Sequence, residues 1–529
     1  MNAMLLTDGY KLDHRRQYPI GTQFVYSNWT PRSNSYLPQA KDGVVVFGIQ
    51  YFVKKYLMEY FDKEFFNKPK EEAIKSFSRR INTFLGPNEV GEQHIADLWE
   101  LGYLPIRLKA LPEGSICPIR VPMLTIINTH SDFFWVTNFL ETLMSCELWL
   151  PMTSATVARL YRKELERHAE KTGFDKSIEL GFLCHDFSMR GMAGLDAAII
   201  SGMGHLTSFV GSETIPAIDA VEEYYCMDAE KDLIAMTVPA TEHSVMCAGG
   251  LDDEFETFKR LLTETYPNGF VSIVSDTWDL WKVVSEFTPR LKQEILNRDG
   301  RFVIRPDSGI PEDIICGIPT ENILTYKDEC YYIPKIGKAD SQTIYTYTTS
   351  IDKNPKEYER YKLTSYQIKG VYECLWDIFG GVVNEKGYKV LDTHVGVIYG
   401  DSITLERQQE IYKRLEAKGF AATNLVLGIG SFTYQYKTRD SLGFAMKATW
   451  CQIDGQEKEI FKQPKTDSGM KNSLKGLIQV LQDENGKYYA KDCVTKEEEN
   501  NSCLEDVFCN GTLLREQSLT DIRERLYVQ

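Results

Sequence analysis

The sequence predicts an α/β fold built on a parallel sheet, with a barrel favoured over an open sheet. From residue 180 onward, short apolar or β-branched runs recur, and each ends in polar, charged or glycine residues. Helical stretches lie between several of these runs, and such alternation is typical of a parallel sheet. Side chains capable of chemistry end nearly every run instead of gathering at one crossover, which favours a barrel.

Six runs are expected to be strands whose carboxyl ends deliver side chains. They are GFLCHDFSMRG (181–191), AMTVPATEHS (235–244), FVSIVSDTWDL (270–280), FVIRPDSG (302–309), HVGVIYGDS (394–402) and NLVLGIGSF (424–432). Ser402 and Thr404 can cap the helix expected over 403–419, which would end at Gly419. Near the C-terminus, Ser518 is expected to cap a last helix in the same way.

Residues 1–150 follow a different pattern, with short apolar runs and one aromatic segment over 131–150. That segment is long enough to span a membrane, but Asp132, Asn138, Glu141 and Glu147 interrupt it, so a buried or interface helix is expected. The following segment, 151–173, is expected to be a capped amphipathic helix that leads into the α/β part. Residues 312–392 form a tyrosine-rich excursion, expected to be a surface subdomain or β-hairpins.

Composition narrows the functional classes. The chain has 529 residues, enough for two to four domains, and a formal net charge of −15, which argues against a general nucleic-acid binder. Its 12 cysteines show no metal-ligand spacing and are expected to be reduced. The N-terminus lacks the apolar core of a signal peptide, so we expect the protein in the cytoplasm and expect no membrane partner.

Two of the expected strand ends carry the residues best suited to catalysis or ligand binding. In IRPDSG, Arg305 offers a fork of donors for phosphate or a carbonyl oxygen, and Asp307 can hold ribose hydroxyls. A structural Arg–Asp ion pair explains this motif equally well. In PATEHS, His243 can be a nucleophile toward phosphate, a proton shuttle or a core histidine, and Asp276 at the next strand end could fix its tautomer.

Three further features suit a phosphorylated ligand but also have simpler explanations. Gly430 and Ser431 can let backbone N–H groups approach a phosphate, with Arg439 nearby, although a tight turn is the default. Asp401 can take a ribose diol or magnesium, or serve as a helix N-cap. The lysine-rich segment 461–476 can close over phosphates as a lid or be a solvated loop.

In this order, the motifs resemble one family, the nicotinamide phosphoribosyltransferases within the type II phosphoribosyltransferases. The resemblance begins with TDGYKLDHRRQYP (7–19) and VYSNWTPR (25–32) and continues through HDFSMRG, GSET, VPATEHS, SIVSD, IRPDSG, GD, the glycine loop with TRD, and FK.P. It covers nearly the whole chain except 312–392. It implies an α/β barrel over 151–439 with the insertion at about 312–392, and a second α+β domain built from both chain ends, 1–150 and 440–529.

The resemblance also implies a homodimer with shared active sites and a set of site residues. Phe187 and Tyr10, the latter from the partner subunit, would sandwich a pyridine ring, with Arg305 and Glu213 at its amide. The catalytic group would be His243, Asp276, Asp307 and Arg305. The phosphoribosyl, pyrophosphate and ATP contacts would come from Arg32, Arg190, Ser272, Asp307, Asp401, Gly430, Ser431, Arg439, Lys462 and Lys471.

The implied reaction joins nicotinamide to the ribose of phosphoribosyl pyrophosphate (PRPP), with Mg²⁺ carried by the pyrophosphate and Asp401 as a candidate ligand. ATP would be a co-substrate that phosphorylates His243. The sequence departs from the family at Glu213, where Asp is usual, so the longer side chain must fold back by one methylene. An ionised Glu213 should accept a hydrogen bond from an amide and repel a carboxylate, which favours nicotinamide over nicotinate. The alternatives are a nicotinate phosphoribosyltransferase and a non-catalytic nucleotide-binding or signalling homologue.

Overall fold

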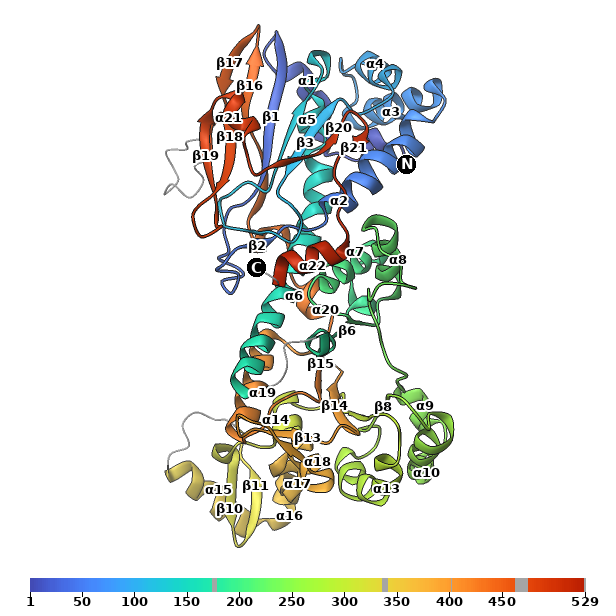
Figure 1. Ribbon diagram of the computed structural model, residues 1–529, viewed down its shortest axis with the longest axis vertical. Coiled ribbons are helices and arrows are strands. Elements are labelled where there is room, and N and C mark those ends of the chain that lie inside the picture. The colour runs from blue at the N-terminus through green and yellow to red at the C-terminus, as the bar shows by residue number, and fades with distance from the viewer. Residues whose placement is uncertain (174–177, 335–340, 401, 462–473, 528–529) are drawn as a thin grey trace.

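The computed structural model describes residues 1–173, 178–334, 341–400, 402–461 and 474–527. The molecule is elongated and has a large sheet in each half (Figure 1). The lower half contains a parallel sheet, and the upper half contains an antiparallel sheet with strands from both ends of the chain. An α/β barrel with a second α+β domain built from both chain ends is therefore confirmed.

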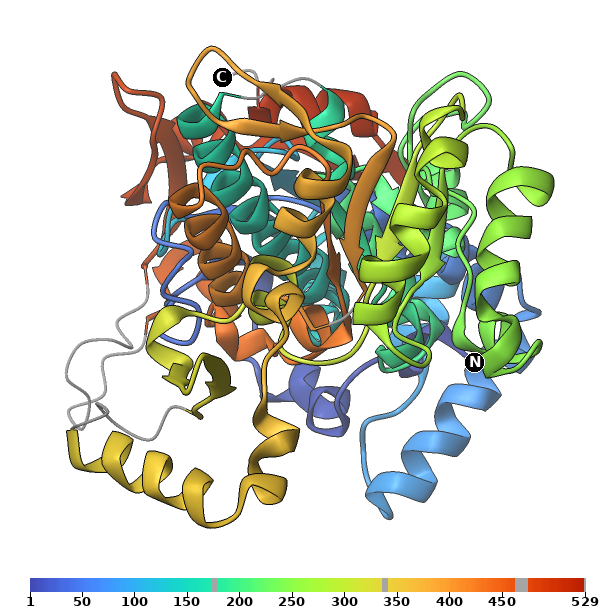
Figure 2. The ribbon, with the colours of Figure 1, turned by 90° about the horizontal axis from the view of Figure 1, so that it is seen from below.

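The parallel sheet has six strands in the order β7-β6-β15-β14-β9-β8. Their bounds are Cys184–Asp186 (β6), Gly211–Ser212 (β7), Val271–Val274 (β8), Phe302–Arg305 (β9), Val395–Tyr399 (β14) and Leu425–Ile429 (β15). Nearly all of these residues are buried, because helices cover the outside of the sheet (Figure 2).

Residues 236–240 lie between the two edge strands and close the ring. The backbone N–H of Met236 donates to the carbonyl of Val210 at 2.7 Å, and that of Ser272 donates to the carbonyl of Pro239 at 2.9 Å. This segment, expected as a strand over 235–244, makes only isolated parallel bridges to Gly211 and Ser272. Pro239 has no N–H to donate, which interrupts a regular ladder.

The antiparallel sheet has seven strands in the order β17-β16-β1-β5-β3-β20-β21. Strand β1 pairs with β16, and β3 pairs with β20, so the two chain ends are joined in one sheet. The bounds are Thr22–Pro31 (β1), Ile106–Ala110 (β3), Leu124–Asn128 (β5), Phe444–Ile453 (β16), Gln456–Glu459 (β17), Glu505–Cys509 (β20) and Thr512–Leu513 (β21). A β-hairpin, Leu477–Gln482 (β18) and Tyr488–Val494 (β19), follows β17.

One helix, α6 (Glu141–Thr172), joins the two halves and corrects the sequence-based expectation. The aromatic segment and 151–173 were expected as two helical units, but α6 runs continuously through Pro151. An interior proline costs about 3 kcal/mol in a helix. Here Pro151 is buried against Gly48, where a side chain would come within 2.5 Å of its ring, and tertiary packing of this kind outweighs the lost hydrogen bond.

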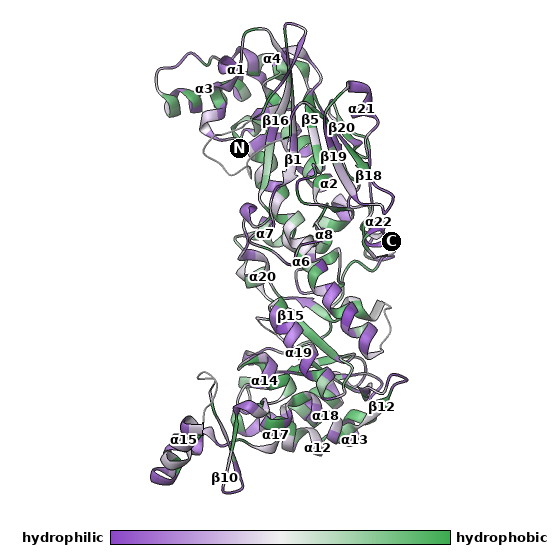
Figure 3. Ribbon diagram, turned by 90° about the vertical axis from the view of Figure 1, so that its left-hand side faces the viewer, coloured by the Kyte–Doolittle hydropathy of each residue, from purple (hydrophilic) through white to green (hydrophobic). Residues whose placement is uncertain are grey.

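The tyrosine-rich excursion contains the expected hairpins. Strands β10 (Ile323–Tyr326) and β11 (Glu329–Tyr332) pack with α15 (Ser341–Lys353) around a small separate core of Leu324, Tyr331, Ile333 and Ile351. Figure 3 shows α15 projecting from the lower half. The flanking helices α14 (Pro311–Cys316) and α18 (Val371–Phe379) belong to the main core, so the part that packs separately is shorter than 312–392.

Two of the three expected cap residues, Thr404 and Ser518, cap their helices, and Ser402 instead accepts a hydrogen bond from the Arg407 guanidinium. Thr404 accepts from the N–H of Arg407 at the start of α19 (Leu405–Ala417), and Ser518 accepts from the N–H of Asp521 at the start of α22 (Leu519–Tyr527). Helix α22 is fixed to the barrel by Arg523, whose guanidinium donates to the carbonyls of Leu206, Leu233, Phe209 and Ile234. Within the described ranges, every helix is too short or too polar to cross a bilayer.

Candidate active site

The carboxyl ends of neighbouring barrel strands bring Phe187, Glu213 and Arg305 to one cavity of about 360 Å³. Phe187 follows β6, Glu213 follows β7, and Arg305 ends β9. The guanidinium carbon of Arg305 lies 5.5 Å from the centre of the Phe187 ring. A flat ligand could therefore contact an aromatic face, a carboxylate and a cation at once.

Glu213 supplies the negative group of this cavity. Its Oε1 accepts hydrogen bonds from His185 Nε2 at 3.0 Å and from the hydroxyl of Thr237. Burial alone would raise the pKa of Glu213, but these hydrogen bonds and the electrostatic effects of His185 and Arg305 outweigh it and lower the pKa below the ordinary value. The carboxylate is therefore ionised at neutral pH.

Arg305 supplies a donor that is not satisfied by the surrounding protein. Its Nη1 donates to the carbonyl of Thr241 at 3.3 Å. Its Nε is buried and has no hydrogen-bond partner among the described residues. A buried donor without a partner is costly, and a ligand carbonyl oxygen would satisfy it.

Asp276, Asp307 and His243 form a second group beside Arg305. Asp276 Oδ2 accepts from the backbone N–H groups of Asp307 and Ser308, at 2.8 and 2.7 Å. His243 Nε2 lies 3.8 Å from Asp307 and 4.0 Å from Asp276, while its Nδ1 is 3.2 Å from the hydroxyl of Thr277. The imidazole side chain is 48% exposed, so Nε2 is accessible between two carboxylates.

Glycines allow the loops of the site to approach one another closely. A Cβ at Gly400 would lie 2.5 Å from Asp307 and 3.1 Å from Arg305 Nε. A Cβ at Gly191 would lie 2.1 Å from the Ser431 hydroxyl, so the loop containing Arg190 meets the glycine loop. Ser431 is the first residue of α20 (Ser431–Gln435), with Gly430 as its N-cap. The structure thus brings Arg190, Gly430 and Ser431 together at one end of the barrel.

Arg32 and Arg439 lie beside one turn, and Arg439 is within electrostatic range of Tyr10. Arg32 Nε donates to the carbonyl of Gly443, just after the turn that contains Arg439. Tyr10 is 63% exposed, and Arg439 is close enough to oppose the burial and the acidic neighbours that raise the Tyr10 pKa. In the part of this chain that the structure describes, the ring contact of Tyr10 is with His14, not with Phe187.

Comparison with known proteins agrees with this geometry. The nicotinate phosphoribosyltransferase family model matches residues 182–512, and the N-terminal domain model of nicotinamide phosphoribosyltransferase matches residues 2–108. A nicotinamide phosphoribosyltransferase of Acinetobacter baylyi is 46% identical, with 100% of this chain and 98% of the relative covered. The chain belongs to the nicotinamide phosphoribosyltransferase family.

A more distant relative supports the same family, and one solved structure shares the fold. The nicotinamide phosphoribosyltransferase of Xanthomonas campestris pv. campestris is 31% identical over 99% of this chain and 97% of its own length. The crystal structure of a nicotinate-nucleotide pyrophosphorylase from Pyrococcus furiosus has a TM-score of 0.52 and 15% identity, covering 100% of this chain and 95% of that one. That likeness shows the shared fold, and membership makes the chain a phosphoribosyltransferase enzyme.

Three of the residues that the family resemblance implied, Asp401, Lys462 and Lys471, lie outside the described residues. Ser272 lies in β8, is buried, and lines the barrel cavity with a hydroxyl that has no partner within the described ranges.

Sequence reasoning missed several residues of this candidate site. His185 and Thr237 hold Glu213, and Thr277 contacts His243. His185 stands in the HDF motif, two residues before Phe187. Alternation along a strand places both side chains on the same face, so this signal was present in the sequence.

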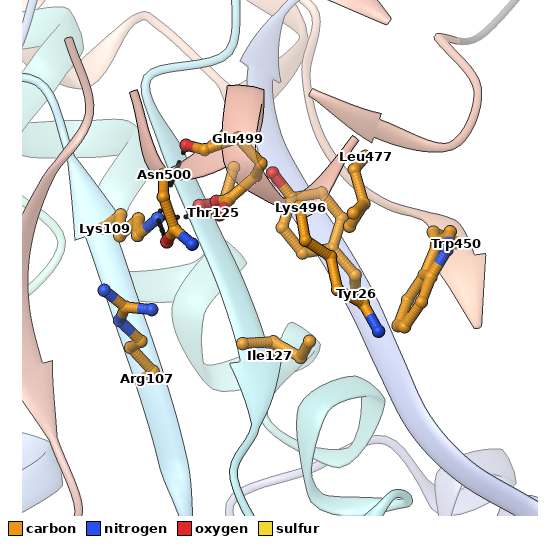
Figure 4. Close-up of a pocket in the computed structure, with 10 residues that line it drawn as sticks. All are labelled: Tyr26, Arg107, Lys109, Thr125, Ile127, Trp450, Leu477, Lys496, Glu499 and Asn500. Carbon is orange, nitrogen blue, oxygen red and sulfur yellow. Dashed lines mark hydrogen bonds and ion pairs between the residues drawn. The ribbon is translucent and has the colours of Figure 1, made fainter. Parts of the chain in front are cut away.

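A second cavity, of about 170 Å³, lies between α21 (Lys496–Asn500) and the antiparallel sheet (Figure 4). Three cations line it, but each is paired with a carboxylate: Arg107 with Asp506, Lys109 with Glu499, and Lys496 with Glu457. It contains none of the predicted site residues. Because its charges are already balanced, the barrel cavity is the better candidate for the phosphoribosyltransferase site.

Proposed function

We propose that this chain joins nicotinamide to the ribose C1 of PRPP, giving nicotinamide mononucleotide and pyrophosphate. The observation that carries the proposal is the complementary pair formed by Arg305 and Glu213 beside the Phe187 ring. A carboxamide has one acceptor and one NH₂ donor in the same plane. The unpartnered N–H of Arg305 suits the amide oxygen, and the ionised Glu213 suits the NH₂ group.

The same pair supports selectivity for the amide. A nicotinate carboxylate would bring a second negative charge against Glu213 and leave no N–H for it to accept. Arg305 would attract either base. Discrimination therefore rests on Glu213.

In the transfer step, the pyridine nitrogen forms a bond to ribose C1 while the bond from C1 to the pyrophosphate oxygen breaks. The bonding electron pair leaves with pyrophosphate, and no protein nucleophile is needed. The chain's residues orient the reactants: Phe187 stacks on the base, Asp307 holds the ribose hydroxyls, and Arg190 with the N-terminus of α20 holds the 5′-phosphate. Positive charge that develops on the sugar lies near the Asp307 carboxylate.

ATP hydrolysis through His243 is part of the proposal. His243 Nε2 is exposed and would take the γ-phosphoryl group, with a new N–P bond replacing the P–O bond to ADP. Thr277 beside Nδ1 helps to orient the ring, and Asp276 supports the loop that carries Asp307. A phosphate on His243 would change the charge at the pyrophosphate subsite and so couple ATP to substrate capture.

Magnesium is expected to arrive with pyrophosphate. Among the described residues there is no cluster of three or more His, Cys, Asp or Glu suited to a metal, whereas Asp307 and the unpartnered Oδ1 of Asp276 offer hard oxygen ligands of the kind Mg²⁺ prefers. When bound, the metal would neutralise the leaving group. Asp401 stays a candidate ligand.

A homodimer with shared sites would complete the pocket. Tyr10, Arg32, Arg439, Lys462 and Lys471 of one subunit would contact the base and phosphates bound in the other. Tyr10 is 63% exposed, and in the described part of the chain its ring contacts His14 and not Phe187, which supports a role toward a partner pocket. We propose the cytoplasm as the site of action, with no nucleic-acid or membrane partner.

The decisive experiment is an assay of mononucleotide formation by purified protein with PRPP and Mg²⁺, each base tested with and without ATP. We expect nicotinamide mononucleotide as the main product, with stimulation by ATP. Comparable turnover of nicotinate would instead favour a nicotinate phosphoribosyltransferase. Absence of product with either base would favour a non-catalytic homologue.

A further inference from the structure

We propose that His185 is a positioning residue that, with Thr237, holds the Glu213 carboxylate in place to receive the carboxamide of the base. This inference rests on the proposed function, because it names what orients the residue that distinguishes the amide from the acid. His185 and Thr237 are called the Glu213 clamp below.

The clamp fixes one oxygen of Glu213 and leaves the other for the ligand. Both hydrogen bonds that Glu213 accepts from side chains in the described part of the chain end on Oε1, one from His185 Nε2 at 3.0 Å and one from the Thr237 hydroxyl. Oε2 receives neither. Glu213 remains 41% exposed at its side chain and lines the barrel cavity, so Oε2 is accessible to a bound base.

The clamp restricts a flexible side chain. The carboxylate of a glutamate is joined to the backbone through three rotatable bonds, so it can take many positions. An unrestrained glutamate would have to be ordered when the base binds, which weakens binding. Two donors at the tip of the side chain order it beforehand.

His185 is itself held rigidly. Its side chain is 8% exposed, and its ring centroid lies 4.8 Å from that of Phe187. On the neighbouring strand, a Cβ at Gly211 would come within 2.7 Å of His185 Nδ1, so the absence of a side chain at Gly211 makes room for the imidazole. His185 therefore supports both the Phe187 ring, which would stack on the base, and the Glu213 carboxylate, which would accept its hydrogen bond.

A neighbouring histidine shows what a purely structural role looks like. His205 is fully buried, and its two ring nitrogens contact the hydroxyl of Tyr434 and the carbonyl of Gly211, both internal groups. The partner of His185 is instead a partly exposed carboxylate that faces the cavity. This difference points to a role in ligand binding.

The test compares His185→Phe, His185→Gln and Thr237→Val with wild type. Steady-state kinetics would be measured with nicotinamide and with nicotinate at saturating PRPP. The phenylalanine keeps a flat ring but removes the donor, so we expect the KM for nicotinamide to rise roughly tenfold, with a smaller change in kcat and weaker discrimination against nicotinate. The glutamine retains an N–H donor and should recover most of the loss. Thr237→Val should give a smaller change in the same direction.

His394→Asn is the matched control. His394 also pairs with a carboxylate, Asp392, at 2.6 Å, but it precedes β14 at the end of the strand opposite to the site. Its kinetics should equal those of wild type.

A His185→Phe enzyme with wild-type KM and base selectivity would overturn the inference while leaving the proposed function intact. If wild type itself failed to use nicotinamide, the proposed function would fall. Circular dichroism checks the fold of each variant. Should His185→Phe not fold, Thr237→Val decides: unchanged KM and selectivity would overturn the clamp, and a raised KM would support it.

Discussion

Asp276 Oδ1 lies 4.0 Å from the imidazole Nε2 of His243. This carboxylate oxygen is buried and has no hydrogen-bond partner among the described residues. The other oxygen of the same carboxylate fixes the backbone of Asp307 and Ser308. One side chain thus links the candidate phosphate acceptor to the loop expected to hold ribose. This link explains how phosphorylation of His243 could be coupled to ribose binding at Asp307.

His243→Ala is expected to abolish ATP hydrolysis and the ATP-driven gain in substrate affinity while leaving slow basal product formation. The base and ribose contacts do not involve His243, so the transfer step itself should persist. ATP consumption and mononucleotide formation would be measured in the same reactions. A variant that ATP stimulates as strongly as wild type would rule out the phosphohistidine.

Glu213→Gln is expected to weaken discrimination against nicotinate because it removes the negative charge and keeps the size of the side chain. The wild-type pKa of Glu213 lies below its usual value, so the carboxylate is ionised above the ordinary pKa of glutamate and becomes neutral only as pH falls further. Selectivity should therefore be constant from about pH 5 to pH 8 in wild type. A steep loss of selectivity within that range would contradict an ionised Glu213.

Mixing two inactive variants tests whether the sites are shared. Tyr10→Ala and Phe187→Ala should each be severely impaired as homodimers. If Tyr10 acts in the partner subunit, a refolded equal mixture contains half heterodimers, each with one intact site, and should regain about a quarter of wild-type activity. If both residues acted within one subunit, each site of a heterodimer would lack one of them, and mixing would restore nothing.

Gly400→Ala is expected to lower kcat/KM by roughly ten- to a hundredfold with little effect on folding. The new methyl group would meet Asp307 and Arg305 Nε and displace both from their positions. Gly181→Ala is a suitable control, because the nearest atom there is a γ-methyl of Val210 at 3.2 Å, which has to shift by only a few tenths of an ångström. Equal kinetics for the two variants would show that the site tolerates this displacement.

Arg523→Met is expected to destabilise the protein by about 3 kcal/mol, because four backbone carbonyls, three of them partly buried, would lose a charged donor. The thermal midpoint should fall, and α22 should become sensitive to protease, while activity at low temperature remains. Arg360→Met, at an exposed position, is the control. An unchanged midpoint for Arg523→Met would show that the packing of α22, and not Arg523, holds the two halves together.

Much of the site could be predicted because its residues sit at the ends of parallel strands. The carboxyl ends of such strands meet at one rim, so Phe187, Arg305 and Asp307 had to converge once the strands were recognised. Glu213 follows a two-residue strand that the sequence pattern did not predict, and only the family resemblance pointed to it. Local signals also predicted the caps at Thr404 and Ser518, which depend only on a backbone N–H group three residues further along the chain.

The tertiary structure decided the features that depend on contacts distant in sequence. The closing segment at 236–240 pairs with two strands although Pro239 interrupts its own pattern, and α6 continues through Pro151 because Gly48 receives the proline ring. Likewise, His185 reaches Glu213 across 28 residues of chain. The sequence alone therefore determined which side chains reach the barrel rim, through strand periodicity. Only the packing of the strands against each other decided which of those side chains hold the others in place.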